Sequence, residues 1–243
     1  MITYLSWDMS RLITWAVALS LLGGCSHNTS PESSRQELNR IGVAFNKETF
    51  IEAARSGEFR KVLLFLDGGI NPDVTDDKGR TGLMKAAGFN EVATVQLLLD
   101  RRASVSLRDH DGMTALIYAV MAGSNNASRV LVDAGADINA TDNRGATALI
   151  YAALDGHYEC VRTLLERGAK PEEMTADGHT ALLLLVKRTK QAAVRPQSER
   201  NALFKVRMDP IRTLRILVDH GANVNATNRR GQTALTLAEE NGP

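Results

Sequence analysis

Apolar residues recur along this chain with a long period rather than the short period of a single helix or strand. One leucine per period occupies the same place, two residues after a threonine and four after a glycine: Leu83, Leu116, Leu149, Leu182 and Leu235. The first three steps are 33 residues, and the last is 53, one period plus an insertion of 20. Such self-similarity indicates stacked structural units, because one short unit cannot bury its own apolar face.

Each unit predicts a turn followed by two short helices. A segment such as Asp142-Asn143-Arg144-Gly145 is typical of a turn, and the threonine two residues later is a good N-cap. Small pairs such as Ala86-Ala87 allow the first helix to pack closely, and Gly or Asn ends it. The second helix carries apolar pairs such as Leu164-Leu165 and is closed by Gly-Ala.

These motifs resemble the ankyrin repeat over about residues 46–243. The resemblance implies an all-α ankyrin-type solenoid of stacked helix-turn-helix units with hairpin-like connecting loops. We expect units at 46–78, 79–111, 112–144, 145–177, 178–230 with an insertion at about 187–209, and 231–243 as a partial cap.

The chain departs from the family pattern in three places. The family's Thr-Pro-Leu-His appears as Thr-Ala-Leu-Ile at Thr114, so apolar packing replaces the histidine that ties neighbouring repeats. Arg102 stands where the other units have glycine, and a positive φ would strain it, so we expect a different turn. Leu235 and Leu237 of the partial cap need cover from the preceding repeat.

The first residues resemble the leader of a bacterial lipoprotein. Residues 12–22 form an apolar run of 11, too short to span a bilayer but suited to a signal peptide. Leu22-Gly23-Gly24-Cys25 resembles a lipobox, which implies a signal peptide at 1–24 and a lipidated Cys25. The alternative is an ordinary signal peptide with an incidental cysteine. Residues 1–8 contain no base, which favours Met9 as the true start.

Residues 25–45 are expected to be the lipidated cysteine and a tether. Residues 26–40 are polar and cannot bury enough surface to fold alone. Ser26 after the cysteine resembles outer-membrane sorting. We therefore expect a protein in the bacterial cell envelope, anchored by lipid and facing the periplasm.

Composition and motifs exclude several classes of function. The net charge is +1, from 29 basic and 28 acidic residues. An overall charge so close to zero gives no reason to expect binding to nucleic acid. The five histidines are scattered and form no ligand pair, and we find no catalytic constellation. Cys160 is expected to be a buried core thiol. We expect no metal, no cofactor and no enzymatic activity, and a monomer.

The resemblance implies that residues two and five after the repeated leucine face a concave groove. The apolar or long side chains at these positions are Lys85, Tyr118, Met121, Tyr151, Leu154 and Leu184. Polar turn residues would rim them: Arg80, His110, Asp111, Asn143, Arg144, Asp177 and His179. An apolar centre inside a polar rim is typical of a protein-binding surface. The alternative is that these side chains only pack against adjacent repeats.

The insertion is strongly basic. Residues 187–209 hold seven Lys or Arg against one Glu and one Asp, a net of +5. One interpretation is a solvated loop with a short amphipathic helix, so that removing residues 190–208 leaves thermal stability nearly unchanged. The other is contact with an anionic partner or with lipid headgroups.

The sequence therefore predicts a lipid-anchored periplasmic module that binds an envelope protein through its concave face. An immunity or antitoxin protein that neutralises a periplasmic toxic effector, and a scaffold for a periplasmic stress enzyme, are alternatives within the same class. These roles rest on family analogy. The rival class is an enzyme.

Overall fold

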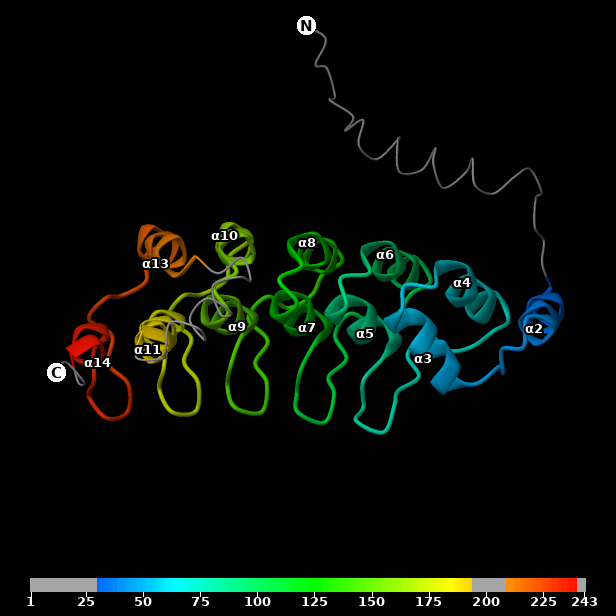
Figure 1. Ribbon diagram of the computed structural model, residues 1–243, viewed down its shortest axis with the longest axis horizontal. Helices are drawn as coiled ribbons and strands as arrows, with labels where there is room; N and C mark the ends of the chain where they lie inside the picture. Colours follow the sequence, from blue (N-terminus) through cyan, green and yellow to red (C-terminus); the bar gives the residue numbers. More distant parts are fainter. Residues whose placement is uncertain (1–29, 194–208, 240–243) are drawn as a thin grey trace, which may run out of the picture.

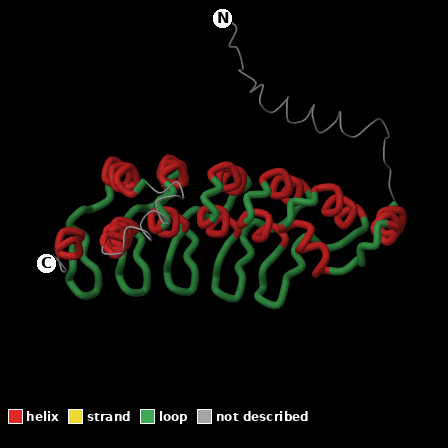
Figure 2. The backbone as a smooth tube through the Cα atoms, viewed as in Figure 1, coloured by secondary structure: helices red, strands yellow, loops and turns green. Residues whose placement is uncertain are grey.

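The computed structural model describes residues 30–193 and 209–239, which form two layers of helices and a row of projecting turns (Figure 1). The inner layer, next to the turns, holds α3 (Lys47–Arg55), α5 (Gly82–Gly88), α7 (Ala115–Met121), α9 (Ala148–Leu154), α11 (Ala181–Ala193) and α14 (Ala234–Glu239). The outer layer holds α2 (Pro31–Arg40), α4 (Phe59–Asp67), α6 (Val92–Asp100), α8 (Asn125–Asp133), α10 (Tyr158–Glu166) and α13 (Pro210–Asp219). The all-α solenoid is confirmed, and no strand occurs in the described ranges (Figure 2).

Threonine hydroxyls start the inner helices, as the sequence predicts. Thr81, Thr114 and Thr147 each accept a hydrogen bond from the backbone N–H three residues later, at 3.3 Å. This contact satisfies one of the N–H groups that a helix start leaves without a partner. No inner helix between α5 and α9 exceeds seven residues, so their stability comes from packing against neighbours.

Small residues let successive inner helices approach closely. Ala86, Ala87, Ala152 and Ala153 are fully buried. Each inner helix contacts the one before and the one after it, from α3 through α14. The core is therefore one continuous apolar strip that runs the length of the stack.

From α4 onward, a hairpin-like turn joins each outer helix to the next inner helix. We call these five turns fingers one to five, at residues 76–80, 109–113, 142–146, 175–179 and 228–232. In each finger the first backbone N–H donates to the fifth carbonyl, at 2.9–3.1 Å. Neighbouring fingers are also joined, for example by Asn143 N–H donating to Asp111 O at 2.9 Å. The row of fingers is thus held by backbone bonds as well as by the helices above it.

The tether expected at residues 25–45 differs from the structure over Pro31–Arg40, which is helix α2 packed on α4. Ser30 caps the helix, and Leu38 is fully buried. Arg35 Nε donates to the carbonyl of Gly68 at 2.7 Å. This segment has too few apolar residues to fold alone, but α4 supplies the surface that Leu38 needs. It closes the first end of the stack.

The first part of the insertion is helical, and it contacts the rest of the stack. Helix α11 continues through Ala193, six residues beyond the end of an ordinary inner helix. Lys190 Nζ donates to the carbonyls of Leu237 and Ala238, at 2.9 and 2.7 Å. Lysine at such a position satisfies the free carbonyls at the end of α14. Since removal of residues 190–208 would delete these bonds, we expect it to cost some stability. Residues 194–208 lie outside the described residues.

The last described helix, α14, is covered on one side only. Leu237 is 7% exposed, because α11 packs on it. Leu235 is 66% exposed, whereas its counterparts in the four preceding units are at most 2% exposed. The expected cover from the preceding repeat therefore reaches Leu237 but not Leu235. Within the described residues, no helix has both the length and the apolar character needed to cross a bilayer.

The turn at Arg102 keeps the shape of its glycine counterparts, so the expectation of a different turn is wrong. Its φ is +64°, and its N–H donates to Leu99 O at 2.9 Å. Gly135 has a φ of +90° and the matching bond to Val132 O at 3.0 Å. Stacking of the units on both sides thus holds an arginine in the left-handed region.

We predict that Arg102→Gly raises the free energy of unfolding by about 0.5–1 kcal/mol. The left-handed conformation costs a side-chain-bearing residue about 1–2 kcal/mol, part of which is offset by the greater freedom of unfolded glycine. Urea unfolding measures the change. Gly135→Ala is the opposite control and should destabilise, since an added Cβ meets nothing within 4 Å and only the backbone is strained. A lower free energy of unfolding for Arg102→Gly than for the wild type would show that the backbone at Arg102 is not strained.

Candidate partner-binding groove

The predicted binding residues line one surface, which we call the inner groove: the uncovered sides of α5, α7, α9 and α11 with the adjoining sides of the fingers. Met121 is 41% exposed, and Leu154 and Leu184 are half-buried. Tyr118 and Tyr151 are also half-buried and pack against the core. The inner helices therefore present a partly apolar floor.

Each tyrosine is tied to the finger that precedes its own inner helix. Tyr118 OH donates to Asp109 Oδ2, and Tyr151 OH donates to Asp142 Oδ2, both at 2.7 Å. Both carboxylates are buried. The other oxygen of each accepts two backbone N–H groups of its finger, at 2.8–3.0 Å. The tyrosines thus brace the finger against the inner helix, a role that the sequence reasoning missed.

The surroundings of the two tyrosine hydroxyls raise their pKa values. Burial and the hydrogen bond to Asp142 raise the pKa of Tyr151 to about 12. Burial and Asp109 also raise the pKa of Tyr118. Both effects favour the neutral hydroxyl, because a phenolate would lie beside a carboxylate in a partly dry site.

The first finger uses cations where the next two use tyrosine. Arg80 Nε donates to Asp76 Oδ2 at 2.8 Å, and Lys85 Nζ lies 3.7 Å from the same oxygen. Burial alone would raise the pKa of Asp76, but the hydrogen bonds from the Arg80 side chain and from backbone N–H groups lower it to about 2. Arg80 and Lys85, both predicted partner contacts, are therefore engaged by the carboxylate of the finger that precedes α5.

The fourth and fifth fingers lack this carboxylate. Thr175 and Asn228 stand in its place and accept the same backbone N–H groups, Thr175 from His179 and Asn228 from Arg230 and Gln232. The residues that correspond to Tyr118 and Tyr151 are here Leu184 and Leu237. A donor on the inner helix thus accompanies a finger carboxylate in three units and disappears with it in two.

The remaining predicted rim residues lie on the fingers. His110 packs against Gly79 of the preceding finger, where an added Cβ would lie 2.7 Å from its ring. Asn143 Nδ2 donates to His110 O at 2.9 Å. Asp111, Arg144 and Asp177 are exposed, and His179 is half-buried. His110 and Asn143 therefore link fingers, whereas the three exposed charges face solvent.

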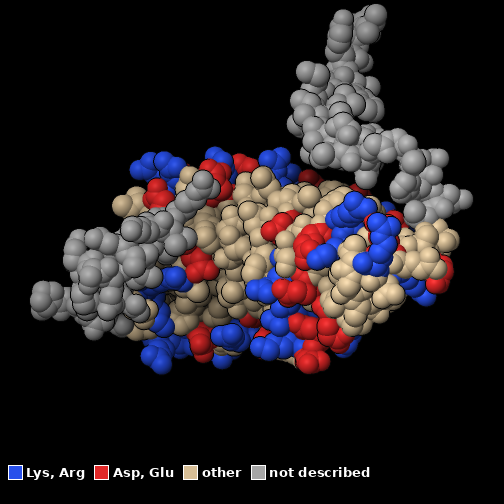
Figure 3. All heavy atoms as spheres, turned by 45° about the vertical axis from the view of Figure 1, so that its right-hand side comes forward, with Lys and Arg blue, Asp and Glu red and all other residues tan. Residues whose placement is uncertain are grey.

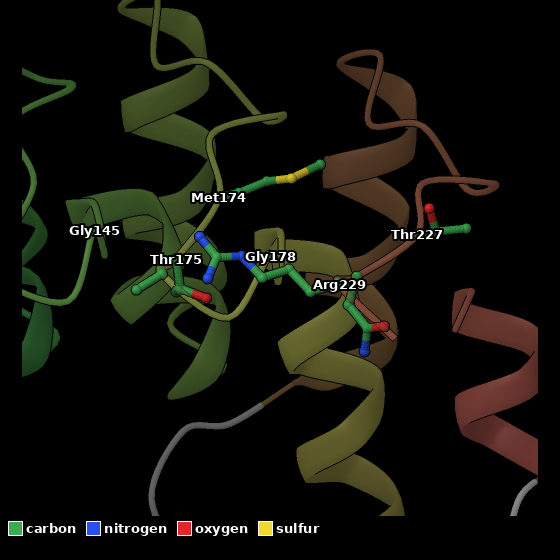
Figure 4. Close-up of a pocket in the computed structure, with 8 residues that line it drawn as sticks. Gly145, Met174, Thr175, Gly178, Thr227 and Arg229 are labelled. Carbon is green, nitrogen blue, oxygen red and sulfur yellow. The ribbon is translucent and has the colours of Figure 1, made fainter. Parts of the chain in front are cut away.

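Charges of both signs are interleaved over the N-terminal part of the stack (Figure 3). Finger five is different, because it carries Arg229 and Arg230 and no acid. Arg229 extends across Gly178 toward Thr175 of finger four (Figure 4), and its Cγ lies 3.0 Å from where a Cβ on Gly178 would be. These arginines are not among the predicted rim residues, all of which lie on fingers one to four.

Two observations concern the candidate metal ligands and the cysteine of the described residues. No group of three His, Cys, Asp or Glu residues there is placed to hold a metal ion. Cys160 is buried, as predicted, and burial raises the pKa of its thiol to about 11. A thiol with that pKa carries almost no thiolate at neutral pH. Cys25 lies outside the described residues.

We predict that Tyr151→Phe lowers the free energy of unfolding by about 1–3 kcal/mol, because buried Asp142 loses a donor. The folded pKa of about 12 exceeds the ordinary 10, so the hydroxyl's contribution is present below pH 10 and is lost as pH rises toward 12. Urea unfolding at pH 7, 9 and 11 should show that the free energy of unfolding falls less with rising pH in the variant than in the wild type. Tyr158→Phe is the control, since that ring stacks under Arg212 on an outer helix. Equal changes in the free energy of unfolding for Tyr151→Phe and Tyr158→Phe would refute the role of Tyr151 as a brace between the finger and the inner helix.

A family model described as "Ankyrin repeats (3 copies)" matches residues 50–142, 109–175 and 131–196. These matches together run from residue 50 to residue 196, more than half of the 243-residue chain. Comparison with curated proteins found no match. Ankyrin repeats are protein-interaction modules and are typically not enzymes. With its stacked helix pairs and linked fingers, the chain belongs to the ankyrin-repeat family.

Proposed function

We propose that this protein is a lipid-anchored interaction module that holds one envelope protein against its inner groove. The family supports binding of another protein. The lipobox-like Leu22-Gly23-Gly24-Cys25 supports a lipid anchor and a periplasmic, outer-membrane location. The described chain begins with α2 at one end of the stack, so an anchor there leaves the inner groove open along its length (Figure 1).

One observation carries the proposal: the groove has apolar side chains that the fold does not use. Met121 is 41% exposed, and Leu154 lies at the corresponding position of the next inner helix. Unlike Tyr118 and Tyr151, they have no polar bond to a finger. Exposed apolar side chains next to charged rim residues such as Asp111 and Arg144 are typical of a protein-binding surface. We therefore assign partner affinity to Met121 and Leu154 first.

We predict that Met121→Ser with Leu154→Ser weakens partner binding by about 2–4 kcal/mol while the melting temperature changes little. The partner is identified by crosslinking in the native envelope, and its affinity for purified wild type and variant is then measured by titration. Met174→Ser with Ile211→Ser is the matched control, since these side chains are 43% and 76% exposed and lie outside the inner helices. Equal weakening in both pairs would place the binding surface elsewhere.

The anchor has a separate test. We predict that Cys25→Ser abolishes metabolic lipid labelling and leaves either an unprocessed precursor or a protein released from the membrane, because two or more acyl chains are needed for stable anchoring. Labelling with a fatty-acid analogue and fractionation of membranes measure both effects. Cys160→Ser is the control and should keep the label. A Cys25→Ser protein that is processed and membrane-bound like wild type would show that the anchor lies elsewhere.

A further inference from the structure

The C-terminal part of the inner groove contains a hollow of about 250 Å³ whose lining is basic. We call it the basic hollow; its lining residues are Asp177, His179, Lys187, Asn228, Arg229, Arg230, Gln232 and Leu237. Three of these side chains are permanently cationic, and one is a carboxylate. Lys187 and Arg230 are exposed, and neither forms an ion pair with a carboxylate of the described residues.

The register of the repeats explains why the described residues do not neutralise this charge. In the first three units the finger carboxylates Asp76, Asp109 and Asp142 occupy the place that Thr175 and Asn228 fill in the last two. The backbone role of that residue is kept, because Asn228 Oδ1 still accepts from Arg230 N–H at 2.9 Å. The negative charge is lost at the place where the sequence adds Arg229, Arg230 and Lys187. The hollow is thus short of a carboxylate that three other units contain.

Polar groups in the hollow are oriented by this network. Asn228 Oδ1 accepts two backbone N–H groups, which fixes its amide so that Nδ2 faces His179 Nε2 at 3.3 Å. An amide nitrogen only donates, so Nε2 accepts and the proton of neutral His179 is on Nδ1. Burial lowers the pKa of His179, and Lys187 lowers it further despite Asp177. His179 is therefore held neutral and adds no positive charge to the hollow.

The floor of the hollow is apolar. Leu237 lines it and is 7% exposed. A glutamate side chain matches this arrangement, because its methylene groups contact an apolar floor while its carboxylate reaches Lys187 and Arg230. A phosphate has no apolar part to place there.

We propose that the basic hollow binds a glutamate-bearing acidic segment of the partner protein and so fixes which way the partner lies along the groove. This inference rests on the proposed function. The hollow is at the α14 end of the stack, opposite α2 and the proposed anchor (Figure 1). That position favours a protein segment over the lipid headgroups of the anchoring membrane.

The test uses the full chain in neutral detergent and a fluorescent hexaglutamate peptide at low salt, with binding followed by anisotropy. Lys187→Gln with Arg230→Gln should weaken binding by about tenfold or more, since two charge-assisted contacts are lost. Lys61→Gln with Arg162→Gln removes the same charge from outer helices and should change affinity less than about twofold. Unchanged thermal melting by circular dichroism verifies that each variant is folded.

A second variant returns the missing carboxylate. Asn228→Asp reproduces the residue of the first three fingers, and its carboxylate would neutralise the hollow from within. Peptide binding should fall at least severalfold. The backbone bonds of the finger can be kept, as Asp142 shows, and His179 Nε2, 3.3 Å from the substituted atom, can supply the donor that Tyr151 gives to Asp142; thermal melting checks the fold. This variant lowers the net charge by one, half the change made by the outer-helix control, so a greater loss of binding than in that control points to the local charge of the hollow.

The outcomes separate the hypotheses. Absence of hexaglutamate binding, or equal loss in the outer-helix control, overturns the basic hollow as an acidic-segment site. Competition by glycerol phosphate at lower concentration than by unlabelled hexaglutamate overturns it in favour of a headgroup phosphate. In either case a partner that still binds wild type and depends on Met121 and Leu154 leaves the proposed function standing. If the chain binds the peptide through Lys187 and Arg230 but no envelope partner is found, the proposed function is overturned and the acidic-segment site is not.

Discussion

Close contact between successive inner helices is the interaction on which the rest of the structure depends. Each unit has helices of about seven and nine residues, which are too short to persist alone in water. Fully buried pairs such as Ala86-Ala87 and Ala152-Ala153 bring neighbouring helices together and join the units into one core. The fingers follow from this stacking, because backbone bonds such as Asn143 N–H to Asp111 O require a fixed spacing between units. The stack even keeps Arg102 in the backbone conformation of a glycine.

The same stacking decides what happens at the two ends. At the first end, α2 covers α4 with Leu38 and turns polar residues outward. At the other end, Leu235 and Leu214 of the described chain are 66% and 38% exposed, although their counterparts within the stack are almost fully buried. Positions with the same sequence pattern therefore differ in burial only through the presence of a neighbour. The nearest-neighbour character of repeat proteins accounts for this difference.

The 33-residue period, the threonine caps and the order of helices could be predicted from the sequence, because each rests on local chemistry repeated five times. Helix α2 could not, since its stability comes from contact with α4 and a single leucine leaves no periodic signal. The contact of the extended α11 with α14 was missed for a similar reason, because Lys190 donates to the carbonyl of Leu237, 47 residues later in the sequence. The groove residues were predicted by register, but the bonds of Tyr118 and Tyr151 to finger carboxylates depend on side-chain directions that register does not contain. The aspartate nine residues before each tyrosine was the available signal.

The first residue of each finger shows how the groove can change chemistry while the fold stays the same. Its backbone task is to accept N–H groups with one side-chain oxygen, and Asp142, Thr175 and Asn228 all do so. The rest of that side chain is free to vary. In the middle fingers the rest of that side chain is a second carboxylate oxygen, which needs a hydrogen-bond donor from the inner helix. Tyr151 OH is that donor for Asp142, so the fold itself uses this tyrosine. Where that oxygen is absent, as beside Leu184 and Leu237, this constraint on the groove is lifted, and cations collect there without a carboxylate partner among the described residues. Selection for partner charge can therefore act on the last two fingers at little cost to the stack, whereas the middle fingers are held by their own carboxylates.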